Sequence, residues 1–76
     1  MLTVETLKDN TVWIVFDEAG GKKLLNAIEQ LLVAKKRDHE HLFGEVPGDD
    51  LDNVRMSGDA ASIVATELRI SFWPKS

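Results

Sequence analysis

None of the 76 residues of this chain is cysteine. This absence excludes a disulfide bond and a thiolate metal site as sources of stability. A chain of this length is expected to form one domain, residues 1–76, that buries only about 60% of its extended-chain surface. Because 43% of the residues are hydrophobic, either a small core or a second copy of the chain must stabilise the fold. A homodimer is therefore one of two expected states.

No apolar run approaches the roughly 18 residues that a membrane-spanning helix needs, and the first ten residues lack the basic and then apolar pattern of a signal peptide. We therefore expect a cytoplasmic protein without a membrane partner. The sequence also lacks a serine nucleophile elbow, a catalytic cysteine and a Walker phosphate-binding loop. This lack of catalytic motifs predicts a protein that is not an enzyme and needs no cofactor.

Basic residues are outnumbered, with nine lysines and arginines against thirteen aspartates and glutamates and a formal net charge of −4. Nucleic-acid-binding proteins usually present a basic face to the phosphate backbone. The charge balance therefore argues against nucleic acid as a partner. It suits a protein partner with a basic surface, which a negatively charged chain attracts over a distance.

The strongest periodic pattern in the chain lies in residues 20–37. Its large apolar residues recur at steps of three and four, which places them on one stripe of an α-helix. These residues are Leu24, Leu25, Ile28, Leu31 and Leu32. Lysine, asparagine, glutamate and glutamine occupy most of the other side. The pattern predicts one helix whose apolar stripe packs on the rest of the fold.

The rest of the chain has the composition of strands and turns. Residues 2–7 and 11–17 flank a turn-forming Asp-Asn pair and predict a hairpin. The second of these strands is apolar on both faces and is expected to be central in the sheet. Further strands are predicted at residues 39–43, 51–57 and 62–73. The order ββαββ(β) predicts the α+β class, as a two-layer sandwich in which one helix packs on a mostly antiparallel sheet of four to five strands.

Large apolar side chains are also predicted on the sheet face that the helix leaves uncovered. In the last strand, Ile70 and Phe72 would face the helix, so Trp73 would point the other way. Trp13, Val15 and Trp73 would then share the far face. Such an apolar patch on a small protein often marks a binding or dimer surface. Alternatively, strand twist and loops cover the two indole rings.

His39 and His41 are the two histidines of the chain, and their spacing is the one feature that resembles metal chemistry. Side chains at positions i and i+2 of a strand point the same way, so both imidazoles could bind one ion. Asp49, Asp50 and Asp52 lie downstream, and zinc sites combine imidazole with carboxylate ligands. A metal-binding domain or metal-dependent enzyme is therefore an alternative. The other interpretation is that the histidines face a partner or form structural hydrogen bonds.

Acidic residues gather after the predicted helix. They are Asp38, Glu40, Glu45, Asp49, Asp50 and Asp52. Catalytic carboxylates must converge in a cleft, where one of them has a shifted pKa, and a chain this small has little room for a cleft. A solvated loop or a partner-binding edge is the simpler interpretation, because dense negative charge steers a basic partner.

Two stretches carry a resemblance to a known family. One is HEHLF at residues 39–43 with GDDL at 48–51, and the other is ELRISFWP at 67–74. With the preceding apolar helix they resemble small immunity proteins of bacterial polymorphic toxin systems, the thirty-second immunity family in the usual numbering. That family combines a helix, a His-x-His-Leu segment, a Gly-x-acid-Leu segment and a closing Leu-Arg-Ile-x-x-Trp strand. The order and rough spacing match over residues 20–74.

The resemblance implies a non-catalytic, cytoplasmic protein that neutralises a cognate toxin by covering it in a tight complex. The acidity of the chain suits a basic toxin, of which nucleases are one class. On this interpretation the contact edge is formed by His39, His41, Glu45, Asp49, Asp50 and Asp52. Trp13 and Trp73 are the alternative contacts, since tryptophan is enriched among residues that dominate binding energy. A homo-oligomeric structural domain sealed by the two tryptophans is the remaining alternative.

Overall fold

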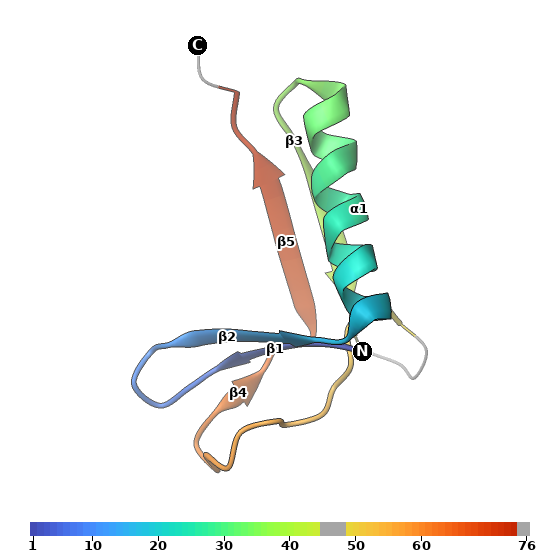
Figure 1. Ribbon diagram of the computed structural model, residues 1–76. Coiled ribbons are helices and arrows are strands. Elements are labelled where there is room, and N and C mark those ends of the chain that lie inside the picture. The colour runs from blue at the N-terminus through green and yellow to red at the C-terminus, as the bar shows by residue number, and fades with distance from the viewer. Residues whose placement is uncertain (45–48, 75–76) are drawn as a thin grey trace.

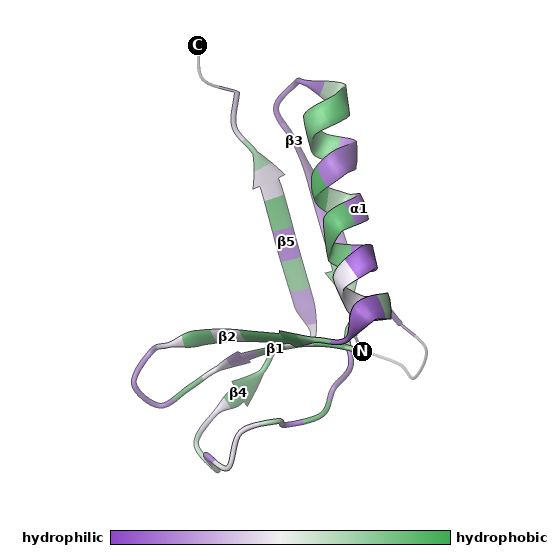
Figure 2. Cartoon of the chain, in the orientation of Figure 1, coloured by the Kyte–Doolittle hydropathy of each residue, from purple (hydrophilic) through white to green (hydrophobic). Residues whose placement is uncertain are grey.

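The computed structural model describes residues 1–44 and 49–74 (Figure 1). Its elements follow in the order β1 (Leu2–Thr6), β2 (Val12–Phe16), α1 (Glu18–Ala34), β3 (Asp38–Phe43), β4 (Ile63–Val64) and β5 (Glu67–Phe72). All strand pairs are antiparallel. The α+β class and the predicted order of elements are therefore confirmed. Along β5, hydrophobic and hydrophilic residues alternate, as in a strand with one covered face (Figure 2).

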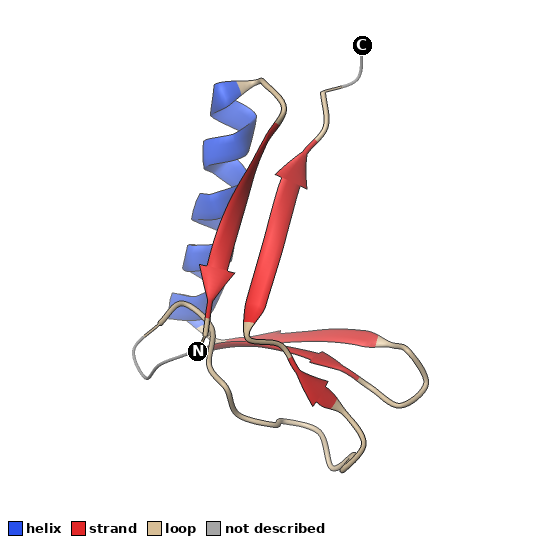
Figure 3. Ribbon diagram, turned by 180° about the vertical axis from the view of Figure 1, so that it is seen from behind, coloured by secondary structure: helices blue, strands red, loops and turns tan. Residues whose placement is uncertain are grey.

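The strands form two separate sheets. β2, β1 and β4 make a three-stranded sheet in that order, and β3 pairs with β5 in a two-stranded sheet, called here the β3–β5 ribbon. The three-stranded sheet projects sideways from the foot of α1 and the ribbon, so that the molecule has the shape of an L (Figures 1 and 3). The prediction of a single sheet under one helix is therefore wrong.

The strand predicted over residues 62–73 is divided at Ala65 and Thr66, and this division separates the sheets. The Ala65 N–H donates to the Val4 carbonyl in the three-stranded sheet, whereas the Thr66 carbonyl accepts from the Gly44 N–H just beyond β3, both at 2.8 Å. Because two consecutive residues bond to different sheets, the chain passes from one to the other at this point. Both halves have strand composition, so the hydropathy pattern does not reveal the change.

The central strand of the three-stranded sheet is β1, and the central position predicted for residues 11–17 is wrong. Leu2, Thr3, Val4 and Glu5 are all buried, whereas most of β2 is exposed. The polar side chains of Thr3 and Glu5 in β1 are buried in hydrogen bonds, so the alternation of apolar and polar residues in β1 does not mark a solvent-exposed face. The two apolar faces of β2 belong to an edge strand that the described part of the chain leaves largely uncovered.

α1 begins after Asp17, whose carboxylate accepts the N–H of Gly20 at 2.9 Å and so caps the first turn. The helix ends before Lys35, whose left-handed backbone (φ 54°) directs its N–H to the Leu31 carbonyl. The helix therefore starts and stops a few residues earlier than the predicted span of 20–37. The rest of the chain covers only part of its apolar stripe.

The core lies where the three-stranded sheet meets α1 and the ribbon. Leu2 and Val4 of β1 pack there with Leu42 of β3 and with Leu51, which is only 2% exposed. Half-buried side chains surround this cluster, and they are Leu24, Ala65, Leu68 and Ile70. The core thus joins segments from all parts of the chain, but few of its members are fully buried.

Residues 51–57 form a loop over the polar face of β1, and the strand predicted there is wrong. The N–H groups of Met56 and Ser57 donate to the Glu5 carboxylate, each at 3.1 Å, and not to the carbonyls of a neighbouring strand. A side chain therefore satisfies the backbone of this segment. Of its apolar residues only Leu51 is anchored in the core, whereas Val54 and Met56 are exposed, so its alternation does not mark a buried strand face.

Glu5 is fully buried, and each of its carboxylate oxygens accepts two hydrogen bonds. Oε1 accepts from the hydroxyls of Ser57 and Ser62, both at 2.7 Å, and Oε2 accepts from the two N–H groups already named. Arg55 extends the cluster, since it donates to the Ser62 hydroxyl and carbonyl at 2.9 Å. Burial raises the pKa of Glu5, but the hydrogen bonds outweigh it and leave the pKa below its ordinary value. The charged carboxylate thus ties the loop to β1.

Candidate functional site

One face of the β3–β5 ribbon points away from the core. Its two strands pair in antiparallel register over their whole length, and side chains directly opposite each other share a face. Leu42, Leu68 and Ile70 pack toward the core, as predicted for Ile70. The opposite face, called here the outer ribbon face, carries His39, His41, Phe43, Glu67, Arg69 and Ser71.

Three ring side chains follow one another along β3 on the outer ribbon face. The ring centroids of His39 and His41 lie 4.7 Å apart in an edge-to-face arrangement. The rings of His41 and Phe43 are stacked, with centroids 5.6 Å apart and an interplanar angle of 3°. The shared face that the i, i+2 spacing predicts is therefore present, and Phe43 extends it by one more ring.

An acidic side chain on β5 fixes the middle ring of this row. Nδ1 of His41 lies 2.5 Å from the Glu67 carboxylate, and the Arg69 guanidinium lies 3.5 Å from the same oxygen. The hydrogen bond from His41 has the largest effect and lowers the pKa of Glu67. Burial raises this pKa by less, and the charge of Arg69 lowers it further. Glu67 therefore remains an anion that orients both His41 and Arg69.

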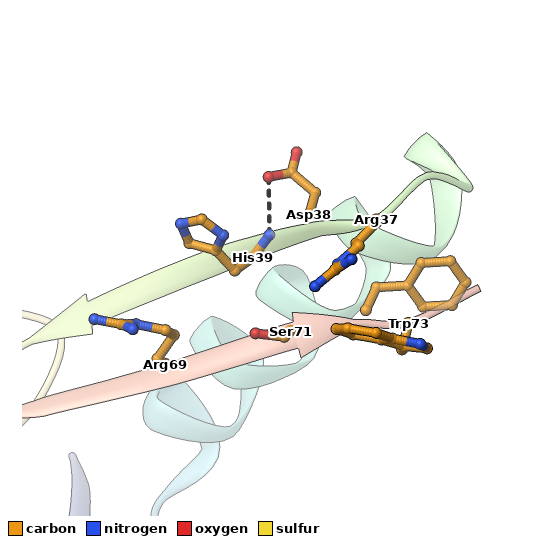
Figure 4. Close-up of a pocket in the computed structure, with 7 residues that line it drawn as sticks. Arg37, Asp38, His39, Arg69, Ser71 and Trp73 are labelled. Carbon is orange, nitrogen blue, oxygen red and sulfur yellow. Dashed lines mark hydrogen bonds between the residues drawn. The ribbon is translucent and has the colours of Figure 1, made fainter. Parts of the chain in front are cut away.

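A shallow pocket of about 370 Å³ lies at the end of the ribbon where β3 begins and β5 ends (Figure 4). The Arg37 guanidinium lies over the Trp73 ring, 3.6 Å from its centroid, and His39, Arg69 and Ser71 complete the wall. Trp73 is still 67% exposed. The pocket is open and combines polar and apolar lining groups, so it suits a side chain of a partner better than an enclosed substrate.

The acidic residues of the predicted contact edge have different surroundings. The Asp52 carboxylate accepts the Leu2 N–H at 2.8 Å, which gives it an internal structural role. Asp49 and Asp50 are half-buried just beyond β3, where the Leu51 N–H bonds to the Phe43 carbonyl. Glu45 lies outside the described residues. The structure thus groups the two histidines with arginines and aromatic rings, while the acidic segment adjoins the Phe43 end of the ribbon.

Trp13 and Trp73 lie on different sheets. Trp13 stands opposite Glu5 in the three-stranded sheet, whereas Trp73 follows the last residue of β5. The single far face predicted for Trp13, Val15 and Trp73 does not form, because the strands do not belong to one sheet. Trp73 lies with His39 and Arg37 at the pocket, and Trp13 is remote from that group along the chain and in sheet topology.

The arrangement of the two histidines bears on the hypothesis that they bind a metal ion. His39 and His41 are adjacent, but His41 uses Nδ1 for the contact with Glu67. Within residues 1–44 and 49–74, no three histidine, aspartate or glutamate side chains converge in a way that could hold a metal ion. The described residues thus provide an imidazole pair engaged with protein groups.

Comparison with known protein families, with curated proteins and with solved structures finds no match to this chain. Among the described residues, no helix combines the length and the apolar character needed to cross a membrane.

Five members of the site are not predicted from the sequence: Arg37, Phe43, Glu67, Arg69 and Ser71. Arg37 belongs to the predicted helix end, and the three residues of β5 become neighbours of the histidines only when β3 and β5 pair. The signal is present in the sequence, because the strands predicted at residues 39–43 and 62–73 have the correct alternation. An antiparallel pairing of 38–43 with 67–72 would have placed these side chains beside the histidines.

Proposed function

We propose that this chain is a non-catalytic, immunity-type binding protein that neutralises a cognate bacterial toxin by covering it. One observation carries the proposal. The two stretches that resemble immunity proteins, residues 39–43 and 67–74, form neighbouring strands and expose one common face. Segments separated by more than twenty residues thus contribute to a single surface, the outer ribbon face. The proposal places the encounter in the cytoplasm, the location that the resemblance implies.

The composition of this surface supports a binding role. Trp73, Arg37 and Arg69 gather at the pocket, and tryptophan and arginine are the residue types most enriched among those that dominate binding energy. The exposed Trp73 ring offers a large apolar area beside two guanidinium groups that bind carboxylates well. A protein partner could place both an apolar and an acidic side chain here.

The side chains of the outer ribbon face are also held in place before any partner arrives. The stacked rings and the contacts from Glu67 to His41 and Arg69 restrict their rotamers. Binding then loses less conformational entropy, which is about 0.5–1.5 kcal/mol for each side chain that would otherwise be immobilised. A rigid face of this kind favours a tight complex over a transient one.

The charge of the chain acts at longer range. The net charge of −4 attracts a basic toxin, although the outer ribbon face carries Arg69 together with Glu67, and the adjoining pocket adds Arg37. Asp38 at the pocket, and Asp49 and Asp50 at the Phe43 end of the ribbon, are the acidic candidates for contact with a basic partner. The proposal therefore assigns steering to the whole chain and the main contact to the outer ribbon face.

Calorimetric titration against the product of the neighbouring gene tests this function. We expect one-to-one binding of nanomolar affinity that weakens at higher salt. Trp73→Ala should weaken binding by about 30-fold or more, as for a residue that dominates an interface. Trp13→Ala is the matched control, since Trp13 belongs to the other sheet, and it should leave the affinity within about 3-fold.

Other results would assign the contact elsewhere. A loss confined to Trp13→Ala would move the interface to the three-stranded sheet. A loss confined to the joint change of Asp49 and Asp50 to lysine would restore the acidic edge as the main contact. Absence of binding at tens of micromolar would remove that gene product as the partner.

A further inference from the structure

An exposed apolar band runs along one strand and continues along the helix. On β2, alternate residues Val12, Ile14 and Phe16 share a face, and on α1 Leu25, Ile28 and Leu32 recur at helical spacing. All six are between 38% and 62% exposed. They are called here the apolar band, and Figure 2 shows that hydrophobic residues are frequent along both elements.

The two halves of the band are joined at Phe16. Its ring carbon Cδ2 lies only 2.9 Å from the position that a Cβ on Gly21 would occupy, so the ring lies directly against the helix. Gly21 begins the stripe that continues through Leu25, Ile28 and Leu32. On β2, Phe16 and Ile14 pair with Leu2 and Val4, so this half of the band continues the face that carries core residues.

The solvent-accessible area of the chain exceeds that of a compact protein of the same mass by about the area that one partner buries in an interface. The chain exposes 5502 Å², whereas a compact protein of 8.5 kDa exposes about 4,700 Å². The excess of about 800 Å² is close to what each partner buries in a standard protein–protein interface. The radius of gyration of 13.4 Å also exceeds the roughly 11.4 Å expected for a compact chain of this length.

The edge of the three-stranded sheet indicates what covers the band. β2 pairs with β1 on one side, and within the described residues no strand pairs with its other side. Soluble proteins usually protect such an edge with lysine, proline or a bulge. The sequence of β2, VWIVF, contains neither charge nor proline. An edge with this composition is suited to pairing with another strand.

We propose that the apolar band is the interface of a two-fold symmetric homodimer in which the β2 strands of two copies pair antiparallel. The pairing would extend the sheet to six strands, and each band would cover the other. A second copy fits better than a foreign partner, because the band is uncharged and permanent homodimer interfaces are the more apolar class. A two-fold axis also closes the assembly, which leaves no free β2 edge for further growth. This proposal is independent of the toxin-binding function.

Sedimentation velocity over a range of concentrations tests the dimer. At micromolar concentration the sedimentation of the full chain should give a molecular mass of twice 8.5 kDa. Leu32→Lys should raise the dimer dissociation constant by about 100-fold or more, because it would bury a charge in an apolar interface. Val33→Lys is the matched control, since Val33 is the next residue, is 80% exposed and lies outside the band. It should remain dimeric.

The absence of cysteine permits a second measurement. A single cysteine can form a disulfide only between copies, and Ile14 is the middle residue of β2. With the two-fold axis placed at this residue, Ile14→Cys should form a covalent dimer on mild oxidation much faster than Val33→Cys, whose exposed thiol cross-links only through random collisions. A monomeric wild type at 100 µM or above would overturn the proposal. A dimer that persists unchanged in Leu32→Lys, or that fails to cross-link through Ile14→Cys, would overturn it as well.

Discussion

Glu5→Gln is expected to lower the midpoint of thermal unfolding by about 10 °C or more. Glutamine has nearly the same volume, so the change leaves no cavity. Its amide nitrogen, however, would face donor groups that now bond to a carboxylate oxygen, such as the Ser57 hydroxyl or the Met56 N–H. The loop over residues 51–57 would lose its attachment to β1, which is the central strand of its sheet.

The effect of Glu5→Gln should depend on pH. Because the folded-state pKa of Glu5 lies below its ordinary value of 4.5, the carboxylate stabilises the fold fully above that value. This stabilisation is lost as the pH falls through the folded-state pKa. The difference in unfolding midpoint between wild type and variant should therefore be constant from pH 7 to about 5 and should narrow below pH 4.5.

Circular dichroism melts at several pH values measure this difference. Glu29→Gln is the control, since Glu29 is an exposed acid on α1, and its midpoint should stay within about 2 °C of wild type. Acidic groups other than Glu5 titrate equally in wild type and Glu5→Gln. The difference between the two unfolding midpoints therefore reports on Glu5 alone. A midpoint for Glu5→Gln equal to wild type, or a difference that persists unchanged to pH 3, would contradict the buried network.

Gly20→Ala should destabilise the chain by about 3 kcal/mol, although alanine is the better helix former by about 1 kcal/mol. A Cβ at residue 20 would lie 1.7 Å from the Met1 carbonyl oxygen and 2.4 Å from its carbon. That oxygen also accepts the Asp17 N–H at 3.0 Å. In the Gly20→Ala variant the first turn of α1 must therefore move away from the start of β1.

Urea denaturation at one fixed protein concentration measures this loss, because a dimer makes stability depend on concentration. Gly58→Ala is the control, since no atom lies within 4 Å of a Cβ built there. It should change the free energy of unfolding by less than about 0.5 kcal/mol. If Gly20→Ala unfolded at the same urea concentration as wild type or higher, the close approach of helix and strand would be wrong.

Local features of the fold were predictable from local chemistry. The hairpin of β1 and β2, the helix and strand β3 follow from residue types and spacing within each segment. The shared orientation of His39 and His41 also follows, because strand periodicity does not depend on the partner strand. These parts of the description needed no knowledge of distant contacts.

The predictions that are wrong concern features that depend on contacts between residues far apart in the sequence. The burial of Glu5 requires serines more than fifty positions away, and the Asp52 carboxylate bonds to the Leu2 N–H across fifty positions. Asp52, which was predicted for the contact edge, instead accepts a backbone N–H group of this chain, as do three aspartates outside that edge, Asp9, Asp17 and Asp59. Acidic composition alone could not distinguish these structural roles from a binding edge.

The exchange of central and edge positions in the three-stranded sheet has the same origin. An apolar strand such as β2 can be covered by its own chain or, as in the dimer proposed above, by a second molecule. The sequence pattern is identical in both cases, because a side chain buried at an interface has the same composition as one buried in a core.

A growth assay tests the central claim, that the outer ribbon face neutralises a toxin, most directly. The neighbouring gene product is produced in a bacterial host with and without this chain, and surviving colonies are counted. Wild type and Val33→Lys should restore growth, whereas the pair Trp73→Ala with Arg69→Glu should not, although circular dichroism shows it folded. A host that dies in the presence of wild type, or that survives equally well with the double variant, would contradict the account.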